Sequence, residues 1–320
     1  MKVLDKTVSQ ITIPTPFAVG DTHVYLIKGD TLSLVDAGVK TKEAWEAFKI
    51  QLKELGYFPK DIEQIILTHH HPDHIGLVEM FPRLKSLTAH KNVDLWLTRD
   101  EDFFSHYEKF FRDYFIECGV PEYLQKVLDK LRSPLKFAGE GKLTQNIDEG
   151  DPLPGHEDWE VIETKGHAQS HLSFLRKHDG VFIGGDHLLQ HISPNPLIEP
   201  PIAADDERPK PMLQYRANLN KCMHLGINTV LPGHGKVFSN PKEIIPTRLS
   251  KQEQRAAKVF SLLKEKSQTP FQICQQIFSK QYDNQIELTM SETIGQLDYL
   301  EDEGLIGKEG ENGILNYYAK

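Results

Sequence analysis

Four candidate metal ligands stand within six consecutive positions, in the segment His69-His70-His71-Pro72-Asp73-His74: they are His69, His71, Asp73 and His74. His69 and His71 are two positions apart at the end of an expected strand, so both imidazoles face the same side and can hold one ion. Asp73 and His74 follow where the chain is expected to turn into a helix, far enough displaced to reach a second ion. Imidazole and carboxylate groups in this pattern predict a site that binds divalent metal ions and activates water.

Three further candidate ligands lie far along the chain, each beside glycine. They are His167 in Lys-Gly-His, Asp186 in Gly-Gly-Asp and His234 in Pro-Gly-His-Gly. Each follows a strand-like segment, and glycine there lets the backbone turn tightly and bring a side chain up to a crowded centre. Scattered histidines with ordinary hydrogen bonds would not explain the joint spacing. We therefore interpret the seven residues as one site.

The elements that must position this site alternate between strands and helices, which predicts an α/β protein with sheets covered by helices. Residues 41–55 have apolar positions three or four apart and end at Gly56, which is typical of an amphipathic helix. Gly29-Asp30 separates two strand-like runs and predicts a hairpin. The other expected strands are 8–13, 61–68, 159–164, 171–176, 181–184 and 229–231.

In these residues the chain resembles the metallo-β-lactamase superfamily. The HxHxDH motif of that family stands at residues 69–74, and its later histidine, aspartate and histidine fall at His167, Asp186 and His234. The resemblance covers roughly residues 8–245 and implies a four-layer αβ/βα sandwich with the metals at one edge. It implies a first metal held by His69, His71 and His167, a second held by Asp73, His74 and His234, and Asp186 as the bridge.

The resemblance also implies the chemistry. Two ions per chain would share a water that is driven toward hydroxide near neutral pH, and this hydroxide would attack the substrate. Asp73 would be the catalytic residue that orients the nucleophile or passes its proton on. The imidazole-rich set predicts two Zn²⁺ ions per chain, with Mn²⁺ or iron as alternatives because affinity alone does not choose the metal in a cell.

Departures from the family pattern narrow the reaction. Zinc β-lactamases of the best-known type use a cysteine in the second site, whereas this chain has Asp186 and no cysteine nearby. A bridging aspartate resembles the glyoxalase II, lactonase and nuclease branches. We expect hydrolysis of an acyl bond, thioester or ester, on a small molecule, with an endoribonuclease or phosphodiesterase as the alternative. A regulatory or assembly protein with a degenerate site is a third hypothesis, and the complete ligand set argues against it.

The last 75 residues are expected to form a separate module, which gives a catalytic domain at 1–245, with a helical insertion at about 99–146, and a second domain at 246–320. Thr269-Pro270 is a helix start, Ser291 is expected to begin a second helix, and Asn312-Gly313 predicts a hairpin. This order resembles the winged-helix domain of β-lactamase-like 2 hydrolases, which include a mitochondrial endoribonuclease. Residues 251–320 carry 8 Lys plus Arg against 11 Asp plus Glu, so we favour a structural or dimerising module over a nucleic-acid partner.

The bulk composition fits a cytoplasmic protein with no membrane partner. The formal net charge is −9 and 26% of residues are charged, which argues against a general surface for nucleic acid or acidic lipid. The first residues have no apolar stretch or cleavage site of a signal peptide, and no run approaches the roughly 20 apolar residues of a spanning helix. Three widely spaced cysteines are typical of reduced thiols.

Two features have alternative interpretations. Aromatic residues recur three or four apart over 103–115, which predicts a helix that packs its stripe on the core or on the partner of a homodimer. The sharper interpretation is a lid over the metals that favours a substrate with a sizeable apolar part.

His171 and His187 lie beside candidate ligands, where each either supports the site or is an ordinary hydrogen-bonded histidine. The proline-rich loop 191–196 follows a candidate ligand and would line the cleft.

Overall fold

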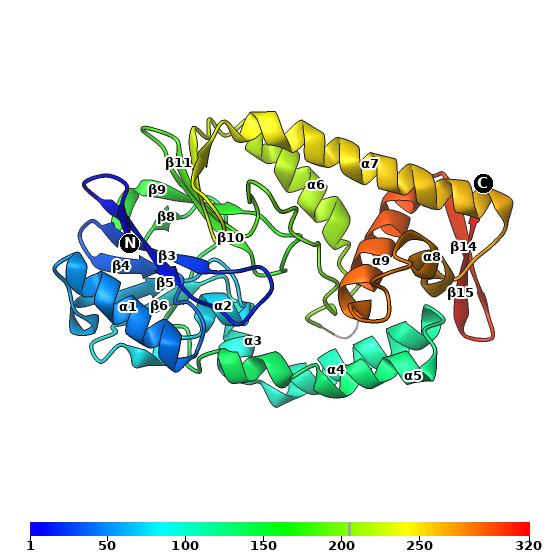
Figure 1. Cartoon of the computed structure of the whole chain (residues 1–320), viewed down its shortest axis with the longest axis horizontal. Helices are drawn as coiled ribbons and strands as arrows, with labels where there is room; N and C mark the ends of the chain where they lie inside the picture. Colours follow the sequence, from blue (N-terminus) through cyan, green and yellow to red (C-terminus); the bar gives the residue numbers. More distant parts are fainter. Residues whose placement is uncertain (204–205) are drawn as a thin grey trace. The chain divides into compact units, whose positions relative to one another are not determined.

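The computed structural model describes residues 1–203 and 206–320, which form two compact units. Each unit draws on three stretches of the chain (Figure 1). The expected division into independent domains at residue 245 stays a prediction. The first unit comprises Met1–Asp100, Ser133–Pro194 and Lys221–Pro241, and the second comprises Glu101–Arg132, Asn195–Asn220 and Lys242–Lys320.

The first unit contains a seven-stranded sheet whose strands lie in chain order. Strands β1 to β4 are antiparallel, and β4 to β7 are parallel. The expected hairpin around Gly29-Asp30 is present, because Tyr25 pairs with Val35 and Lys28 with Leu32. The strands are β1 (Lys2–Val3), β2 (Val8–Ile13), β3 (Thr22–Lys28), β4 (Leu32–Val35), β5 (Gln64–Ile66), β6 (Ser86–Ala89) and β7 (Gln145–Asn146).

Helices cover one face of this sheet and close a core with it. Helix α1 (Lys42–Glu54) begins at Thr41, whose hydroxyl accepts from the backbone N–H of Ala44, and it buries Ala44, Phe48 and Leu52 against the strands. The predicted helix over 41–55 is therefore confirmed. The same face carries α2 (Pro72–Ile75), α3 (Val93–Leu97) and three short 3-10 helices at Pro59–Asp61, Val78–Met80 and Ser133–Phe137.

A second sheet of six strands completes the sandwich, and its apolar side chains form a core with the opposite face of the first sheet. Trp159, Phe174 and Leu231 of this sheet share that core with Tyr25 and Ile66 of the first. The pair β11–β12 is parallel, so both strands end at the same edge. In spatial order the strands are β13 (Phe238–Ser239), β12 (Thr229–Pro232), β11 (Val181–Gly185), β10 (Leu172–Arg176), β9 (His156–Glu163) and β8 (Pro152–Leu153).

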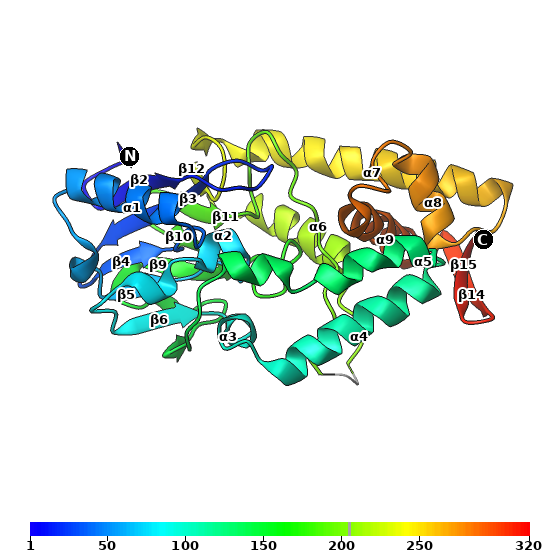
Figure 2. The ribbon, with the colours of Figure 1, turned by 60° about the horizontal axis from the view of Figure 1, so that its bottom comes forward.

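The second unit is mainly helical. The aromatic helix α4 (Glu101–Glu117) lies beside the segment with α5 (Glu122–Gln125) and a 3-10 helix at Lys126–Lys130 (Figure 2), where Arg132 donates to Glu108. Its aromatic stripe is buried with Phe271 and Met290 of the C-terminal helices, so it packs within this unit. Helix α6 (Pro211–Cys222) belongs mostly to the second unit and ends in the first. Helix α7 (Pro241–Glu265) begins at the last residue of the first unit and continues in the second.

The C-terminal segment has the expected order of helix, helix and hairpin. Thr269 caps α8 (Pro270–Ile277), and Asn312-Gly313 joins β14 (Ile306–Glu311) to β15 (Ile314–Ala319) with positive φ at both turn residues. The predicted start of the second helix at Ser291 is wrong, because α9 runs from Ile286 to Asp302. Ser291 lies inside that helix, and its hydroxyl accepts from the backbone N–H of Ile198. No helix in the described ranges is long and apolar enough to cross a bilayer.

Candidate metal centre

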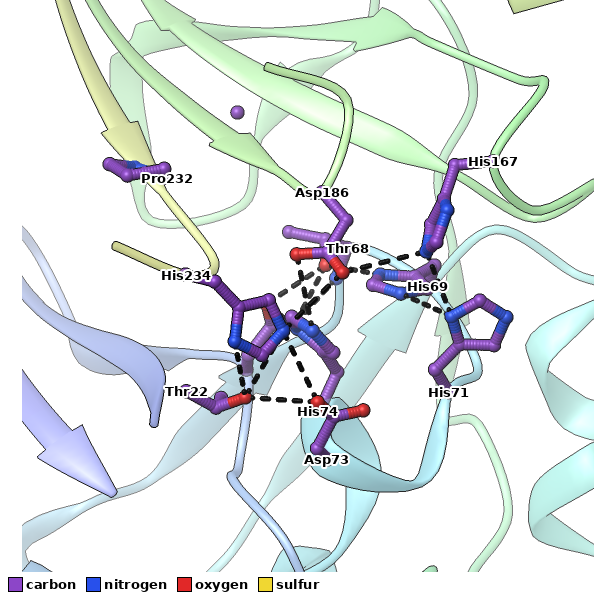
Figure 3. A network of polar contacts seen from close by, with 12 residues as sticks. Thr22, Thr68, His69, His71, Asp73, His74, His167, Asp186, Pro232 and His234 are labelled. Atoms are coloured by element: carbon purple, nitrogen blue, oxygen red, sulfur yellow. Dashed lines mark hydrogen bonds and ion pairs between the residues drawn. The ribbon is translucent and has the colours of Figure 1, made fainter. Parts of the chain in front are cut away.

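The candidate ligands lie where strands of the two sheets end. In the first sheet, β5 leads through Leu67 and Thr68 into His69 and its neighbours, and Pro72 opens α2 immediately afterwards. In the second sheet, β11 ends at Gly185 and β12 at Pro232, so the parallel pair brings the residues that follow them to one edge. All seven predicted ligands meet at this place (Figure 3).

Three histidine nitrogens converge in the first group. Nδ1 of His71 lies 3.0 Å from Nε2 of His69 and 3.0 Å from Nε2 of His167. These three residues form one of the sets that could hold a metal ion. Three imidazoles are a donor set that zinc accepts in proteins.

A second group lies beside the first. Nε2 of His234 is 3.2 Å from Oδ2 of Asp73, and these two residues form a potential metal-binding set with His74. Thr22 adds a hydroxyl that donates to the same Asp73 oxygen at 3.1 Å. Thr22 and His234 are brought together by a β-bridge between their backbones.

Asp186 lies between the two groups and reaches both (Figure 3). Its Oδ2 is 3.5 Å from Nε2 of His167 and 3.4 Å from Nε2 of His234. Its Oδ1 is 3.5 Å from Nε2 of His74. The carboxylate therefore lies beside histidines of both groups, with Oδ2 between His167 and His234 and Oδ1 beside His74.

Hydrogen bonds on the far side of the rings fix which nitrogen faces the centre. Asp36 accepts from Nδ1–H of His74 at 2.8 Å and from the hydroxyl of Thr68 at 2.8 Å. That hydroxyl accepts from Nδ1–H of His69, and the carbonyl of Asp21 accepts from Nδ1–H of His234. Each Nε2 is thereby left with a lone pair that points into the centre, the arrangement in which histidine binds a metal.

Two buried atoms of the centre support a bound cation. Nε2 of His74 and Oδ1 of Asp186 make no hydrogen bond among the described residues. Burying an unpaired polar atom costs about 1–3 kcal/mol, so such atoms require an explanation. A cation bound by both atoms would satisfy them, and the residues present therefore fit a metal ion.

The charge balance points the same way. Burial alone would lower the pKa of His74, but Asp186, Asp36 and Asp73 surround it and raise that pKa well above its usual value. Burial would also lower the pKa of His234, but Asp186 and Asp73 outweigh burial and raise that pKa to about 10. This part of the centre therefore attracts positive charge, which protons or metal ions can supply. By contrast, burial holds the pKa of His69 and of His71 well below its usual value.

Other contacts at the centre were not predicted. Asp36 follows β4 and adopts a positive φ of 61°, an uncommon conformation that Asp tolerates better than most residues. The position of Asp36 directly after β4, beside β5, was the feature of the sequence that could have indicated its place at the centre. His171 was considered but not assigned as a ligand, and it accepts from the backbone N–H of Asp186. His187, also left open, is buried with its ring centre 6.3 Å from that of His171.

The fold and the centre define a class of protein, and comparison with known families agrees. The sequence pattern of the metallo-beta-lactamase superfamily matches residues 18–234. The chain belongs to this superfamily, and it is a metal-dependent hydrolase with the predicted α/β sandwich. A curated relative, the "Probable metallo-hydrolase YqjP" of Bacillus subtilis (strain 168), is 41% identical over 307 residues, which are 96% of each chain.

More distant relatives share the fold. A metallo-beta-lactamase family protein from Thermus thermophilus has a TM-score of 0.82 at 24% identity and covers 99% of this chain and 100% of its own. A beta-lactamase domain protein from Burkholderia ambifaria has a TM-score of 0.80 at 22% identity, covering 100% and 94%. The "Beta-lactamase-like protein 2 homolog" of Caenorhabditis elegans is 22% identical over 270 residues, 83% of this chain and 74% of its own.

Proposed function

We propose that this protein is a dinuclear metal-dependent hydrolase that cleaves an acyl bond, a thioester or an ester, in a small molecule. One ion would be held by His69, His71 and His167, and the other by Asp73, His74 and His234. The observation that carries the proposal is the position of Asp186, whose carboxylate oxygens lie 3.4 to 3.5 Å from histidine nitrogens of both groups. A residue placed in this way can serve both ions.

Zinc is the metal we propose, because five imidazoles dominate the donor set, and Mn²⁺ or iron are the alternatives. When bound, a metal pair supplies a water activated near neutral pH and an electrophile for the oxygen of the attacked group. The neutral Nε2 atoms fixed by Asp36, Thr68 and Asp21 suit this task, because a metal ligand must carry a lone pair.

Asp73 is the catalytic residue in this proposal. Its Oδ2 is held by the Thr22 hydroxyl and lies beside Nε2 of His234, which fixes the orientation of the carboxylate. Burial would raise the Asp73 pKa, but His74 and His234 outweigh burial and lower it. The carboxylate is therefore ionised at neutral pH and can accept a hydrogen bond from the attacking water, which orients that water.

Helix α9 supports a small-molecule substrate over nucleic acid. A helix that reads nucleic acid is exposed and basic, whereas most of α9 is buried within the second unit. Its polar residues are used internally: Arg208 pairs with Asp298 at 2.5 Å, and Arg255 pairs with Glu292. The endoribonuclease or phosphodiesterase alternative relies on the helix, helix, hairpin order of α8, α9, β14 and β15.

The test is thiol release from a panel of acyl thioesters of increasing chain length, using zinc-loaded protein. Asp73→Asn keeps the shape of the side chain and removes its charge, and Asp30→Asn, on the exposed turn after β3, is the matched control. We expect release by the wild type and by Asp30→Asn, and a loss of about 100-fold or more for Asp73→Asn.

Silence across the panel, from protein that holds two ions, would contradict acyl hydrolysis. The alternative is then tested with single-stranded RNA. Binding that weakens steeply between about 50 and 200 mM salt, together with strand cleavage, would establish it.

A further inference from the structure

His171 contacts the backbone of the residue that we propose as the bridge. The backbone N–H of Asp186 donates to Nε2 of His171 at 3.0 Å, and the imidazole is fully buried. A backbone amide can only donate, so Nε2 carries a lone pair and the ring proton is on Nδ1. His171 belongs to none of the sets of described residues that could hold a metal ion.

The hydrogen bonds continue from the other side of the ring. Nδ1–H of His171 donates to the hydroxyl oxygen of Thr164 at 2.7 Å. The hydroxyl groups of Thr164 and Ser173 are hydrogen-bonded to each other at 2.8 Å. Ser173 donates to the carbonyl of Gly184 at 3.3 Å. A carbonyl can only accept, so each proton in the series is fixed by an amide at one end and a carbonyl at the other. His171, Thr164 and Ser173 each have 0% exposure, so water does not compete.

This series of hydrogen bonds begins and ends at the same turn of the backbone. It starts at the N–H of Asp186 and ends at the carbonyl of Gly184, on either side of Gly185. Gly185 has a φ of +47°, and a Cβ there would lie 2.8 Å from Nε2 of His171 and 3.0 Å from Cβ of Thr68. The backbone at Gly185 is therefore in close contact with the imidazole of His171 and the side chain of Thr68, and only glycine fits there.

We propose that His171 is a positioning residue of the metal centre, which holds the backbone of Asp186 so that its carboxylate faces both groups of ligands. This inference rests on the proposed function, because it assigns Asp186 to the metals. The carboxylate oxygens lie 3.4 to 3.5 Å from three histidine nitrogens, so a small rotation of the turn would move the carboxylate away from one group. Groups that orient metal ligands in this way affect metal affinity by about 10- to 100-fold.

Two substitutions separate the two hydrogen bonds of the ring. In His171→Asn the side-chain amide nitrogen takes the place of Nδ1, so the bond to Thr164 can remain while the bond to Asp186 is lost. In His171→Gln the amide oxygen reaches the place of Nε2, so Asp186 keeps its acceptor. The zinc dissociation constant is measured against a chromophoric chelator, together with the metal content after gel filtration.

We expect His171→Asn to bind zinc about 10- to 100-fold more weakly than the wild type, and His171→Gln to remain within a few-fold of it. Asn is smaller than Gln and leaves more of the ring volume empty, so a residue that only fills space would give the same order. Thr164→Val keeps the packing volume and separates the two roles, because only a positioning role of His171 weakens zinc binding in that variant. Equal affinities of His171→Asn and wild type would overturn the proposal.

A second measurement needs no variant at this position. Imidazole ¹⁵N NMR of the zinc-loaded wild type should show His171 with its proton on Nδ1, and an Nε2–H tautomer would overturn the proposal.

Thr164→Val keeps the shape of Thr164 and removes the acceptor of that proton, so we expect it to weaken zinc binding without touching Asp186. If His171→Asn fails to fold, the tautomer and Thr164→Val decide.

The two proposals fail in different ways. Wild-type protein that takes up no zinc overturns both. A panel of thioesters that is not hydrolysed contradicts only the proposed substrate, since the chelator titration requires no substrate. If zinc is bound and thioesters are hydrolysed but His171→Asn behaves as the wild type, only the role of His171 is lost.

Discussion

Nε2 of His74 and Oδ1 of Asp186 lie 3.5 Å apart, buried, and each without a hydrogen-bond partner among the described residues. The far side of the His74 ring is well satisfied, because Asp36 accepts from its Nδ1–H at 2.8 Å. The ring is thus oriented by one carboxylate so that its lone pair faces another. A lone pair and a carboxylate oxygen repel each other unless a proton or a metal ion lies between them, and we propose a metal ion at this place.

The first prediction concerns Asp36, which orients His74 without facing the centre itself. In Asp36→Asn one of the two accepting oxygens becomes an amide that cannot accept, while His74 and Thr68 still offer their donors. We expect the zinc dissociation constant to rise about 10- to 100-fold, measured by chelator competition. Asp30→Asn controls for the loss of one negative charge, and a similar change in both variants would contradict this role of Asp36.

The second prediction concerns the pH dependence of stability through His156. Its Nε2–H donates to Ser33, whose hydroxyl donates to Gln64, and burial lowers the pKa of His156 to about 4. The unfolded histidine takes up a proton near pH 6.5, so the unfolded state binds more protons between about pH 6.5 and 4. Stability is therefore lost as the pH falls through this window, by up to about 3 kcal/mol.

His156→Gln should remove this loss. The three tryptophans (Trp45, Trp96 and Trp159) all lie in the first unit, so their fluorescence reports its unfolding by urea. Between pH 7 and 5 we expect a shallower fall of the unfolding free energy in His156→Gln than in the wild type. The exposed His178→Gln is the matched control. A wild-type slope in His156→Gln would show that this histidine is not the buried group that titrates.

The third prediction concerns the buried ion pair of Arg208 with Asp298 in the second unit, where Asp298 is 1% exposed. Arg208→Met leaves the carboxylate buried without its partner, which costs about 3–5 kcal/mol. The double variant Arg208→Met/Asp298→Leu removes both charges and should recover most of that stability. Urea unfolding followed by the circular dichroism of the helices measures this, and a double variant as unstable as the single one would contradict it.

The fourth prediction concerns the capping box of α8. The Thr269 hydroxyl accepts from the N–H of Gln272 at 3.2 Å, and the Gln272 side chain accepts from the N–H of Thr269 at 3.0 Å. Thr269→Ala should destabilise the second unit by about 1 kcal/mol, whereas Thr269→Ser keeps the hydroxyl and most of the stability. Zinc binding should be unchanged in both. Loss of zinc from Thr269→Ala would contradict a local effect.

The residues that meet at the centre were predictable because each carries a local signal. Residues 69–74 hold four of them in one motif, and His167, Asp186 and His234 each stand beside glycine after a strand. Hairpins and helices with caps, such as the turn at Asn312-Gly313, were predictable for the same reason. These features depend on a few consecutive residues, which the sequence displays directly.

Features that depend on distant contacts were missed. Thr22 meets His234 across 212 positions, and nothing near Thr22 indicates this partner. Ser291 has the chemistry of a helix cap, but it lies inside α9, where its hydroxyl accepts from the backbone N–H of Ile198, a residue far away in sequence. The packing of residues 101–132 with the C-terminal helices likewise depends on side chains far apart in sequence.

The measurement that tests the central claim most directly is the number of zinc ions per chain after loading and gel filtration, determined by elemental analysis with the protein concentration. We predict two ions in the wild type and fewer in Asp186→Asn, which lacks the charge that the two sites share. His178→Gln, an exposed histidine outside the centre, should keep two. One ion or none in the wild type, or two in Asp186→Asn with unchanged affinity, would contradict a dinuclear centre bridged by Asp186.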